Sequence, residues 1–362
     1  MNTTLADESA LAPDRAAPGL LGLAERGLLP DALIRAGIRR LCEQRLAECN
    51  RGDAEARQYR HRMLIEQLRS APVAVHTDAA NAQHYEVPTA FFQHCLGPRL
   101  KYSACYFTDP SATLEQAENT MLELYAQRAG LADGQDILEL GCGWGSLSLW
   151  MAERYPNARI TAVSNSASQR QHIEAECLRR RLLNLRVITC DINTLALPVE
   201  AFDRCVSVEM FEHVRNHRAL MARIASWLRP GGALFVHIFA HRQAAYLFDT
   251  EGTDNWMGRH FFTGGMMPAT DTLLWFQEHL RIEDQWLVDG THYQRTANAW
   301  LRNQDERRDE VMTTLTGAYG SAELARLWFQ RWRIFWMSCA ELFGYAHGQE
   351  WLVAHYRFVR GD

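Results

Sequence analysis

The 362-residue chain has 47% hydrophobic and 22% charged residues, close to globular averages, which excludes a mainly disordered or collagen-like chain. Its net charge of -5 offers no basic surface to a nucleic-acid partner. The nine cysteines are scattered without a C-x-x-C pair, so we expect buried free thiols and no metal site.

The N-terminal part of the chain is predicted to be helical after a loose tail. Residues 1–18 lack the basic-then-apolar pattern of a signal peptide. No run of 18 apolar residues occurs, so we expect a cytoplasmic protein without a membrane span. From residue 20 to about 70, apolar residues recur at steps of three and four, which indicates helices, and residues 71–88 form a predicted loop.

The middle of the chain alternates between apolar runs and helical segments. A helix predicted over 113–128 ends in a glycine-bounded segment, and the alternation begins at residue 135. Such alternation predicts βαβ units and a mostly parallel sheet. The predicted strands are 136–140, 159–163, 185–189, 203–208 and 233–239, the helices 146–155, 167–181 and 218–228, and the last turn 229–232.

After residue 240 the alternation stops. Ten aromatic residues lie between 241 and 300, and they indicate either ordinary core packing or a cap over a pocket at the carboxyl edge of the sheet. Residues 303–345 are predicted to be helical again, and 351–359 to be a last strand.

A glycine-rich turn, Glu139–Gly145, separates the first predicted strand of the sheet from its helix. Glycines there allow a tight turn and let a ligand approach the backbone. A dinucleotide fingerprint is not favoured, because its sixth position is Ser146 and no acidic residue occurs in 161–166. The turn has instead the E/D-x-G-x-G pattern of methyltransferases that use S-adenosylmethionine (SAM).

Seven motifs in the same order carry a family resemblance. With them the chain resembles the cyclopropane fatty acid synthase superfamily, and within it most of all the coclaurine-type N-methyltransferases of plant alkaloid pathways. The motifs are HYEVPTAFF (84–92), LKYSACYF (100–107), ELGCGWGSL (139–147), VSNSASQ (163–169), VSVEMFEHV (206–214), HFFTGGMMP (260–268) and HY (292–293).

The resemblance implies an α/β fold, with the Rossmann-like sheet of a class I SAM-dependent methyltransferase, an N-terminal helical region and an inserted aromatic-rich cap. The expected regions are N-terminal helices (1–75), a SAM-binding core with its N-terminal lid (76–240), a substrate cap with helices (241–345) and a final strand returning to the core (346–362).

The same resemblance implies a site for SAM and for its product, S-adenosylhomocysteine. A glutamine suits a ribose diol because it supplies both a donor and an acceptor, and an aromatic face attracts the sulfonium cation. The implied residues are Tyr102 and Ser103 at the methionine moiety, Gly141 and Gly143 beneath it, Ser164 and Gln169 at the ribose, and Asp191 and Ile192 beside the adenine.

The candidate catalytic cluster follows a strand end. If a helix begins there, positions three and four apart face one side, which places Glu209 with Glu212 and His213 around one pocket mouth. Neighbouring carboxylates raise the pKa of each other and of a nearby histidine. An amine nucleophile needs a free lone pair, and a positioned base that removes its proton typically accelerates a reaction ~10²–10⁴-fold.

The resemblance assigns roles to this cluster. In the plant N-methyltransferases the pair matching Glu212 and His213 is catalytic. In the lipid-cyclopropanating members, the glutamate matching Glu212 helps hold a bicarbonate that acts as base, together with the positions matching His237 and Tyr293.

Two departures from the lipid enzymes concern the bicarbonate site. Ala104 replaces a cysteine there and Phe239 an isoleucine, so we expect activity that does not depend on bicarbonate.

Phe261 and Phe262 precede two glycines, a combination suited to a loop that shapes a pocket wall. With His237 and Phe239 they form the predicted substrate pocket.

The sequence therefore predicts a SAM-dependent N-methyltransferase that acts on a small aromatic or cyclic amine. Two alternatives remain open at this point. One is a cyclopropane synthase or C-methyltransferase on unsaturated phospholipid acyl chains, which would need a membrane surface. The other is a SAM-binding protein without catalysis, which the intact Glu212, His213 and Tyr293 disfavour. A monomer and a homodimer are both compatible with the sequence.

Overall fold

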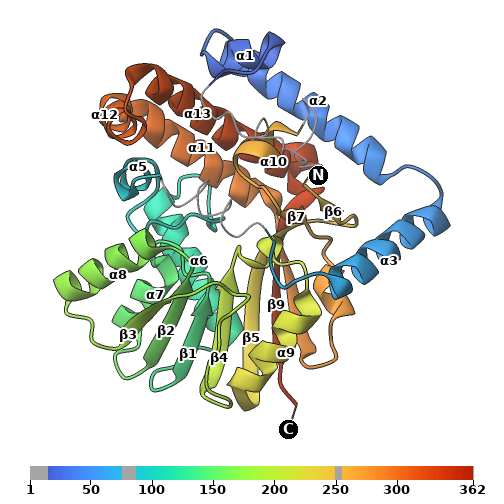
Figure 1. Ribbon diagram of the computed structural model, residues 1–362, viewed down its shortest axis with the longest axis vertical. Helices are drawn as coiled ribbons and strands as arrows, with labels where there is room; N and C mark the ends of the chain where they lie inside the picture. Colours follow the sequence, from blue (N-terminus) through green and yellow to red (C-terminus); the bar gives the residue numbers. More distant parts are fainter. Residues whose placement is uncertain (1–14, 76–86, 249–254, 362) are drawn as a thin grey trace, which may run out of the picture.

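The computed structural model describes residues 15–75, 87–248 and 255–361. The predicted tail up to residue 14, most of the predicted loop and the first residues of the HYEVPTAFF motif lie outside this part of the chain. The predicted N-terminal helices are confirmed as α1 (Gly19–Glu25), α2 (Asp31–Cys49) and α3 (Ala54–Ser70), which wrap around one side of the molecule (Figure 1).

The centre of the molecule is a seven-stranded sheet with the order β3-β2-β1-β4-β5-β9-β8. The first five strands pair in parallel, whereas β9 runs antiparallel between β5 and β8. This arrangement confirms the predicted α/β fold class. The strands are β1 (Asp136–Leu140), β2 (Arg159–Ser164), β3 (Leu185–Thr189), β4 (Phe202–Val208), β5 (Leu228–His241), β8 (Arg281–Val288) and β9 (Trp351–Val359).

Two features of the sheet differ from the sequence prediction. The predicted turn at 229–232 lies within β5, as a bulge between the pairs Phe202–Leu228 and Arg204–Ala233. Strand β8 was not predicted and lies within the range assigned to the cap. It is the last strand of the sheet, and its mostly exposed or half-buried side chains show no apolar run by which the sequence could indicate it.

The predicted helices flank the sheet. Helix α6 (Leu114–Ala129) begins with a capping box between Thr113 and Gln116 and ends at Gly130, whose φ of 64° suits a glycine C-cap. The remaining helices of this layer are α7 (Ser146–Arg154), α8 (Ala167–Arg180) and α9 (His217–Trp227). Their bounds lie within one residue of the predicted ones.

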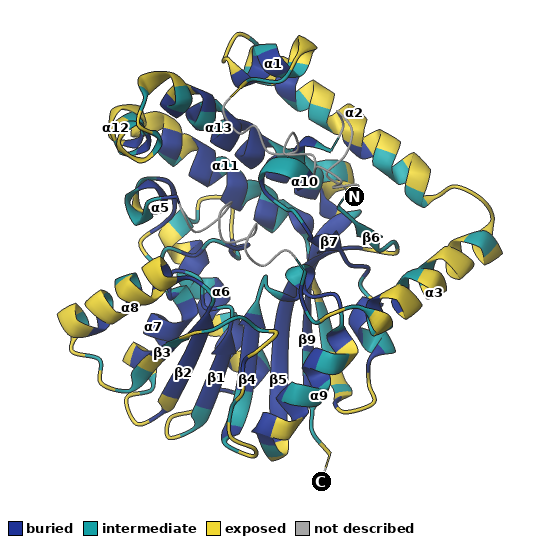
Figure 2. Ribbon diagram, in the orientation of Figure 1, coloured by how far each residue is buried: buried dark blue, intermediate teal, exposed yellow. Residues whose placement is uncertain are grey.

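A second layer of helices covers the carboxyl ends of the parallel strands (Figure 1). Figure 2 shows that the sides of α11 and α13 turned toward the interior are buried. The fully buried Trp300, Trp332 and Trp336 form the centre of this layer. Its helices are α5 (Thr89–Cys95), α10 (Trp256–His260), α11 (Gly290–Glu306), α12 (Arg308–Tyr319) and α13 (Ala322–Gly344), with the short strands β6 (Tyr246–Leu247) and β7 (Met266–Met267) beside them.

A buried carboxylate joins the N-terminal helices to this layer. Glu25 of α1 accepts hydrogen bonds from Trp256 of α10 at 2.8 Å and from the Arg331 guanidinium of α13 at 3.0 Å. The guanidinium and these donors hold the pKa of Glu25 below its usual value despite its burial. Within the described ranges, no helix has the length and apolar character that a bilayer crossing requires.

Candidate functional site

A cavity enclosing about 1310 Å³, counting its mouth, lies between the carboxyl ends of the strands and the helical layer. Its walls come from the segment 100–103, the glycine turn, the end of β4, and helices α11 and α13. A second cavity of about 700 Å³ adjoins it and shares Gly141, Gly143, Gln169, Met210 and His213. The two cavities thus form one site on both sides of the glycine turn.

The glycine turn leaves room for a ligand at one of its glycines. Gly141, Gly143 and Gly145 all have positive φ values, of 78°, 51° and 81°. A Cβ atom on Gly141 would lie 2.7 Å from Met210 Cβ, and one on Gly145 2.6 Å from Ile173. At Gly143 it would meet no atom of the described residues within 4 Å. Packing therefore requires two of the glycines, whereas Gly143 borders open space.

Seven of the eight predicted cofactor residues line these cavities. Tyr102 and Ser103 line the larger one, and Ser164 and Ile192 the smaller one. Ser164 Oγ donates a hydrogen bond to Gln169 Oε1 at 2.6 Å, which orients the glutamine amide. Asp191 is the exception, because its carboxylate caps the following turn by accepting from Asn193 N.

Glu139, which opens the glycine motif, also lines the larger cavity. Ser148 of α7 donates a hydrogen bond to its carboxyl group. Burial raises the pKa of Glu139 to about 8, so the group is mostly protonated at neutral pH. It therefore presents a neutral acid to the cavity.

The carboxylate of Glu209 lines the larger cavity. It accepts hydrogen bonds from Ala104 N at 3.0 Å, Tyr293 OH at 2.8 Å and His237 Nε2 at 3.1 Å. Its φ of 47° is unusual for a residue with a side chain, a strain typical of functional sites. Burial raises the pKa of Glu209, and the nearby Lys101 ammonium is the largest opposing influence.

Glu212 has a different environment from Glu209. Its side chain is fully buried and does not line the cavity, and its Oε1 accepts from Phe239 N at 2.8 Å. Burial, together with the nearby charge of Glu209, raises the pKa of Glu212 well above its usual value. Since Glu209 has the cation and more donors, it is the more acidic of the two and loses its proton before Glu212 does.

The prediction that three side chains surround one pocket mouth is therefore correct for Glu209 and His213 but wrong for Glu212. The reason is the local backbone. Residues 211–213 form a single 3₁₀ turn, and Glu209 precedes it in a left-handed conformation, so the α-helical spacing does not apply.

His213 borders both cavities and stacks on Phe262, with ring centroids 5.6 Å apart and planes 2° from parallel. Burial, with a smaller contribution from Arg215, lowers the pKa of His213 to about 4, although the charge of Glu209 acts in the opposite direction. Glu209 does raise this pKa, as expected, but desolvation dominates, so the net shift is downward. His213 is a neutral imidazole at pH 7.

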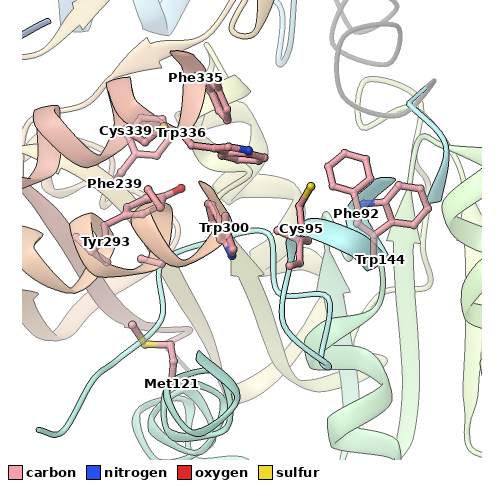
Figure 3. Close-up of a cluster of buried hydrophobic side chains, with 14 of the residues drawn as sticks. Phe92, Cys95, Met121, Trp144, Phe239, Tyr293, Trp300, Phe335, Trp336 and Cys339 are labelled. Carbon is pink, nitrogen blue, oxygen red and sulfur yellow. The ribbon is translucent and has the colours of Figure 1, made fainter. Parts of the chain in front are cut away.

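Aromatic side chains form much of the wall of the larger cavity. Figure 3 shows Phe239 and Tyr293 close to Cys339, with Trp144 at the other end of the group. The predicted pocket residues Phe239 and Phe262 line the cavity. His237 lies behind Glu209 instead, away from the lining.

Phe261 also differs from the prediction. It is fully buried and stacks on Phe335 at 4.3 Å without lining the cavity. Its role is therefore packing.

Sequence reasoning missed several wall residues. Phe335, Leu342 and Phe343 belong to α13, outside every recognised motif. Lys101 was also missed, although it is the only lysine of the chain and lies within the LKYSACYF motif. Its ammonium group donates to Ser103 Oγ at 2.5 Å and to the carbonyl of Ala104 at 2.6 Å.

Comparison with known proteins adds to this geometry. The family model described as mycolic acid cyclopropane synthetase matches residues 74–349. The (S)-coclaurine N-methyltransferase of Thalictrum flavum subsp. glaucum is 37% identical over 94% of this chain and 95% of its own length. The cyclopropane-fatty-acyl-phospholipid synthase of Escherichia coli strain K12 is 27% identical, over 70% of this chain and 66% of its own.

Solved structures agree with these similarities. The crystal structure of a coclaurine N-methyltransferase bound to N-methylheliamine and S-adenosylhomocysteine has a TM-score of 0.91 and 36% identity, covering 94% of this chain and 98% of its own. A cyclopropane synthase from Mycobacterium tuberculosis, at 22% identity and a TM-score of 0.67, covers 80% of this chain and 100% of its own and shares the fold.

Proposed function

The chain belongs to the mycolic acid cyclopropane synthetase family and is a SAM-dependent methyltransferase, and we propose that it methylates the nitrogen of a small aromatic or cyclic amine. Within the family, its similarity to N-methyltransferases extends along nearly the whole chain. The observation that carries the proposal is the carboxylate of Glu209 in an aromatic chamber that continues directly to the glycine turn.

The chain's residues fit SAM. The open space at Gly143 admits a ligand against the backbone, and the oriented amide of Gln169 suits a ribose. Tyr102 lines the same cavity with an aromatic ring that suits a sulfonium. When bound, SAM supplies an electrophilic methyl group and leaves as S-adenosylhomocysteine.

The part of the larger cavity around Glu209 fits an amine. The charge of Glu209 favours a cation, as do the faces of the surrounding aromatic rings. Methylation of an amine places a positive charge on nitrogen, so both features stabilise the charge that develops there. Phe239, Phe262 and Phe343 provide an apolar wall for the body of such a substrate.

His213 is the proposed base. Because its imidazole is neutral at pH 7, it can accept the proton of the amine nitrogen. The charge of Glu209 stabilises the imidazolium that forms. Glu212, buried behind the cavity wall and protonated, supports the segment by accepting the Phe239 N–H bond.

The hydrogen bonds of Glu209 favour an amine over a lipid substrate. The family resemblance assigns His237 and Tyr293 to an external bicarbonate in the lipid enzymes. In this chain both side chains hydrogen-bond to Glu209, and so does the backbone N–H of Ala104. The carboxylate of Glu209 therefore already occupies the hydrogen-bond donors that a bound bicarbonate would need.

Incubation with radiolabelled SAM tests the proposal against both alternatives. One arm offers a panel of secondary and tertiary cyclic amines, and the other offers vesicles of phospholipids with unsaturated acyl chains. We expect label in an amine product and none in the lipid, with strong loss in the Glu209→Gln variant. Cyclopropanated or branched acyl chains would overturn the proposal. SAM binding without transfer to any acceptor would indicate a binding protein.

A further inference from the structure

A chain of buried polar groups extends from Glu209 away from the cavity. His237 of β5 and His355 of β9 are register partners on neighbouring strands, and both are fully buried. His237 Nε2 lies 3.1 Å from Glu209 Oε1, and His355 Nε2 lies 2.9 Å from His237 Nδ1. At the outer end, Arg128 of α6 lies 2.7 Å from His355 Nδ1. Three hydrogen bonds thus connect a half-buried guanidinium to the cavity carboxylate.

The direction of this chain follows from the guanidinium. An arginine can only donate, so His355 Nδ1 accepts and its proton is on Nε2. That proton is donated to His237 Nδ1. The N–H proton of His237 is therefore on Nε2, which donates it to Glu209. Burial and nearby cations lower the pKa of both histidines well below the usual value, so each is a neutral imidazole with one tautomer.

We propose that Arg128 and His355, which lie outside the substrate cavity, are positioning residues for methyl transfer that hold the Glu209 carboxylate ionised and in place. The proposal rests on the function proposed above for Glu209. Each hydrogen bond of the chain points its donor toward Glu209, so each stabilises the anion over the neutral acid. Aligned donors also polarise one another in a buried setting.

Other groups face the same carboxylate and the same chain. Tyr125 OH also lies 2.9 Å from His237 Nδ1, so in this tautomer it shares the single lone pair of that nitrogen with His355 Nε2–H. Arg128 packs over the Trp286 ring, 5.0 Å from its centroid, and lies near Tyr106 and Asp284. The titratable groups around Glu209 are Lys101 and Cys105 from the loop, Tyr125 from α6, Glu212 and His213 from the 3₁₀ turn, Tyr293 from α11 and Cys339 from α13.

Because Lys101 contacts the cavity itself, the outer members of the chain give the cleaner test. His355→Phe removes the donor to His237, and His355→Gln offers an amide N–H in its place. Arg128→Gln removes the charge, whereas Arg128→Lys keeps a charged donor. These variants separate the loss of a directed donor from the loss of a side chain.

The first measurement is the pH profile of kcat with an amine that the wild type methylates. Loss of donors raises the pKa of Glu209, so the acidic limb for His355→Phe and Arg128→Gln should move upward by about one pH unit. At the wild-type midpoint this lowers kcat ~5-fold, and well below the midpoint ~10-fold. His355→Gln and Arg128→Lys should recover most of the shift, and SAM affinity should stay unchanged. His241→Gln changes another buried histidine of β5 that lies outside the chain, and its profile should match the wild type.

The second measurement needs no substrate. Nitrogen-15 NMR of the histidines should show the Nε2–H tautomer for both His237 and His355 in the wild type at pH 7. In Arg128→Gln, His355 should lose this preference. An Nδ1–H tautomer of either imidazole in the wild type would overturn the proposal, as would superimposable pH profiles for the wild type, His355→Phe and Arg128→Gln. If no amine is methylated, the function of Glu209 fails while the NMR result still decides the geometry of the chain.

Discussion

Substituting Gly143 by alanine separates backbone strain from ligand contact. Gly143 has a φ of 51°, and a Cβ atom there would meet no atom of the described part of the chain within 4 Å. Gly134, in the turn before β1, has a φ of 83° and equally open surroundings, but it lies outside both cavities of the site. Gly134→Ala is therefore a matched control for strain alone.

The expected magnitudes follow from this comparison. A left-handed conformation costs a residue with a Cβ about 1–2 kcal/mol, so both alanine variants should lose a similar, small part of the free energy of unfolding. Only Gly143→Ala adds a methyl group where the proposed site brings SAM against the backbone. Overpacking of a close contact costs about 1–3 kcal/mol, which corresponds to roughly 5- to 150-fold weaker SAM binding. The larger Gly143→Val should abolish binding.

Thermal unfolding and calorimetric titration with SAM and S-adenosylhomocysteine measure both effects. The melting temperatures of the two alanine variants should agree closely. Gly141→Ala should be less stable than either, because its Cβ would overlap Met210. If Gly143→Ala binds SAM as tightly as Gly134→Ala, the ligand does not approach the backbone at this glycine. In that case the assignment of the turn to SAM is wrong.

Activity in bicarbonate-depleted buffer should equal that in normal buffer, because Glu209 satisfies the donors available to an anion; a loss that added bicarbonate restores would favour the lipid alternative. Phe262→Ala should raise KM for the amine far more than for SAM, whereas Phe261→Ala should mainly lower the melting temperature, since only Phe262 lines the cavity. Glu209→Gln and His213→Ala should each lower kcat by about 10²-fold or more with SAM affinity within a few-fold, as calorimetry and steady-state kinetics can check. Glu212→Gln should keep most activity, because glutamine resembles the protonated acid; a comparable loss would make Glu212 the base. For the wild type, kcat/KM for the amine should rise with pH as the substrate loses its proton, and His213 should not limit it above pH 6 because burial lowers its pKa to about 4.

The order of the elements could be read from the sequence because it depends on local patterns. Short apolar runs that alternate with helical segments predicted the parallel strands, and helical periodicity predicted α7 and α8 almost to the residue. The residues of the cofactor side were implied by the family resemblance instead, and seven of the eight line the two cavities. Strand β8 escaped prediction because an edge strand with exposed charged residues needs no apolar run.

The chemical centre depended on contacts that only the tertiary structure decides. The sequence placed Glu209, Glu212 and His213 together, but which of them faces the cavity depends on the left-handed backbone at Glu209 and the short 3₁₀ turn after it. The protonation states depend on burial and on partners such as Lys101, which is far away in the sequence.

The wall residues of α13 and the chain through His355 and Arg128 show the same limit. Each belongs to a helix or strand whose position is set by packing with elements more than a hundred residues away. A local pattern records whether a side chain is buried, but not what it is buried against. The sequence alone therefore determined the family and the fold, while tertiary packing decided which carboxylate faces the cavity and which donors hold it.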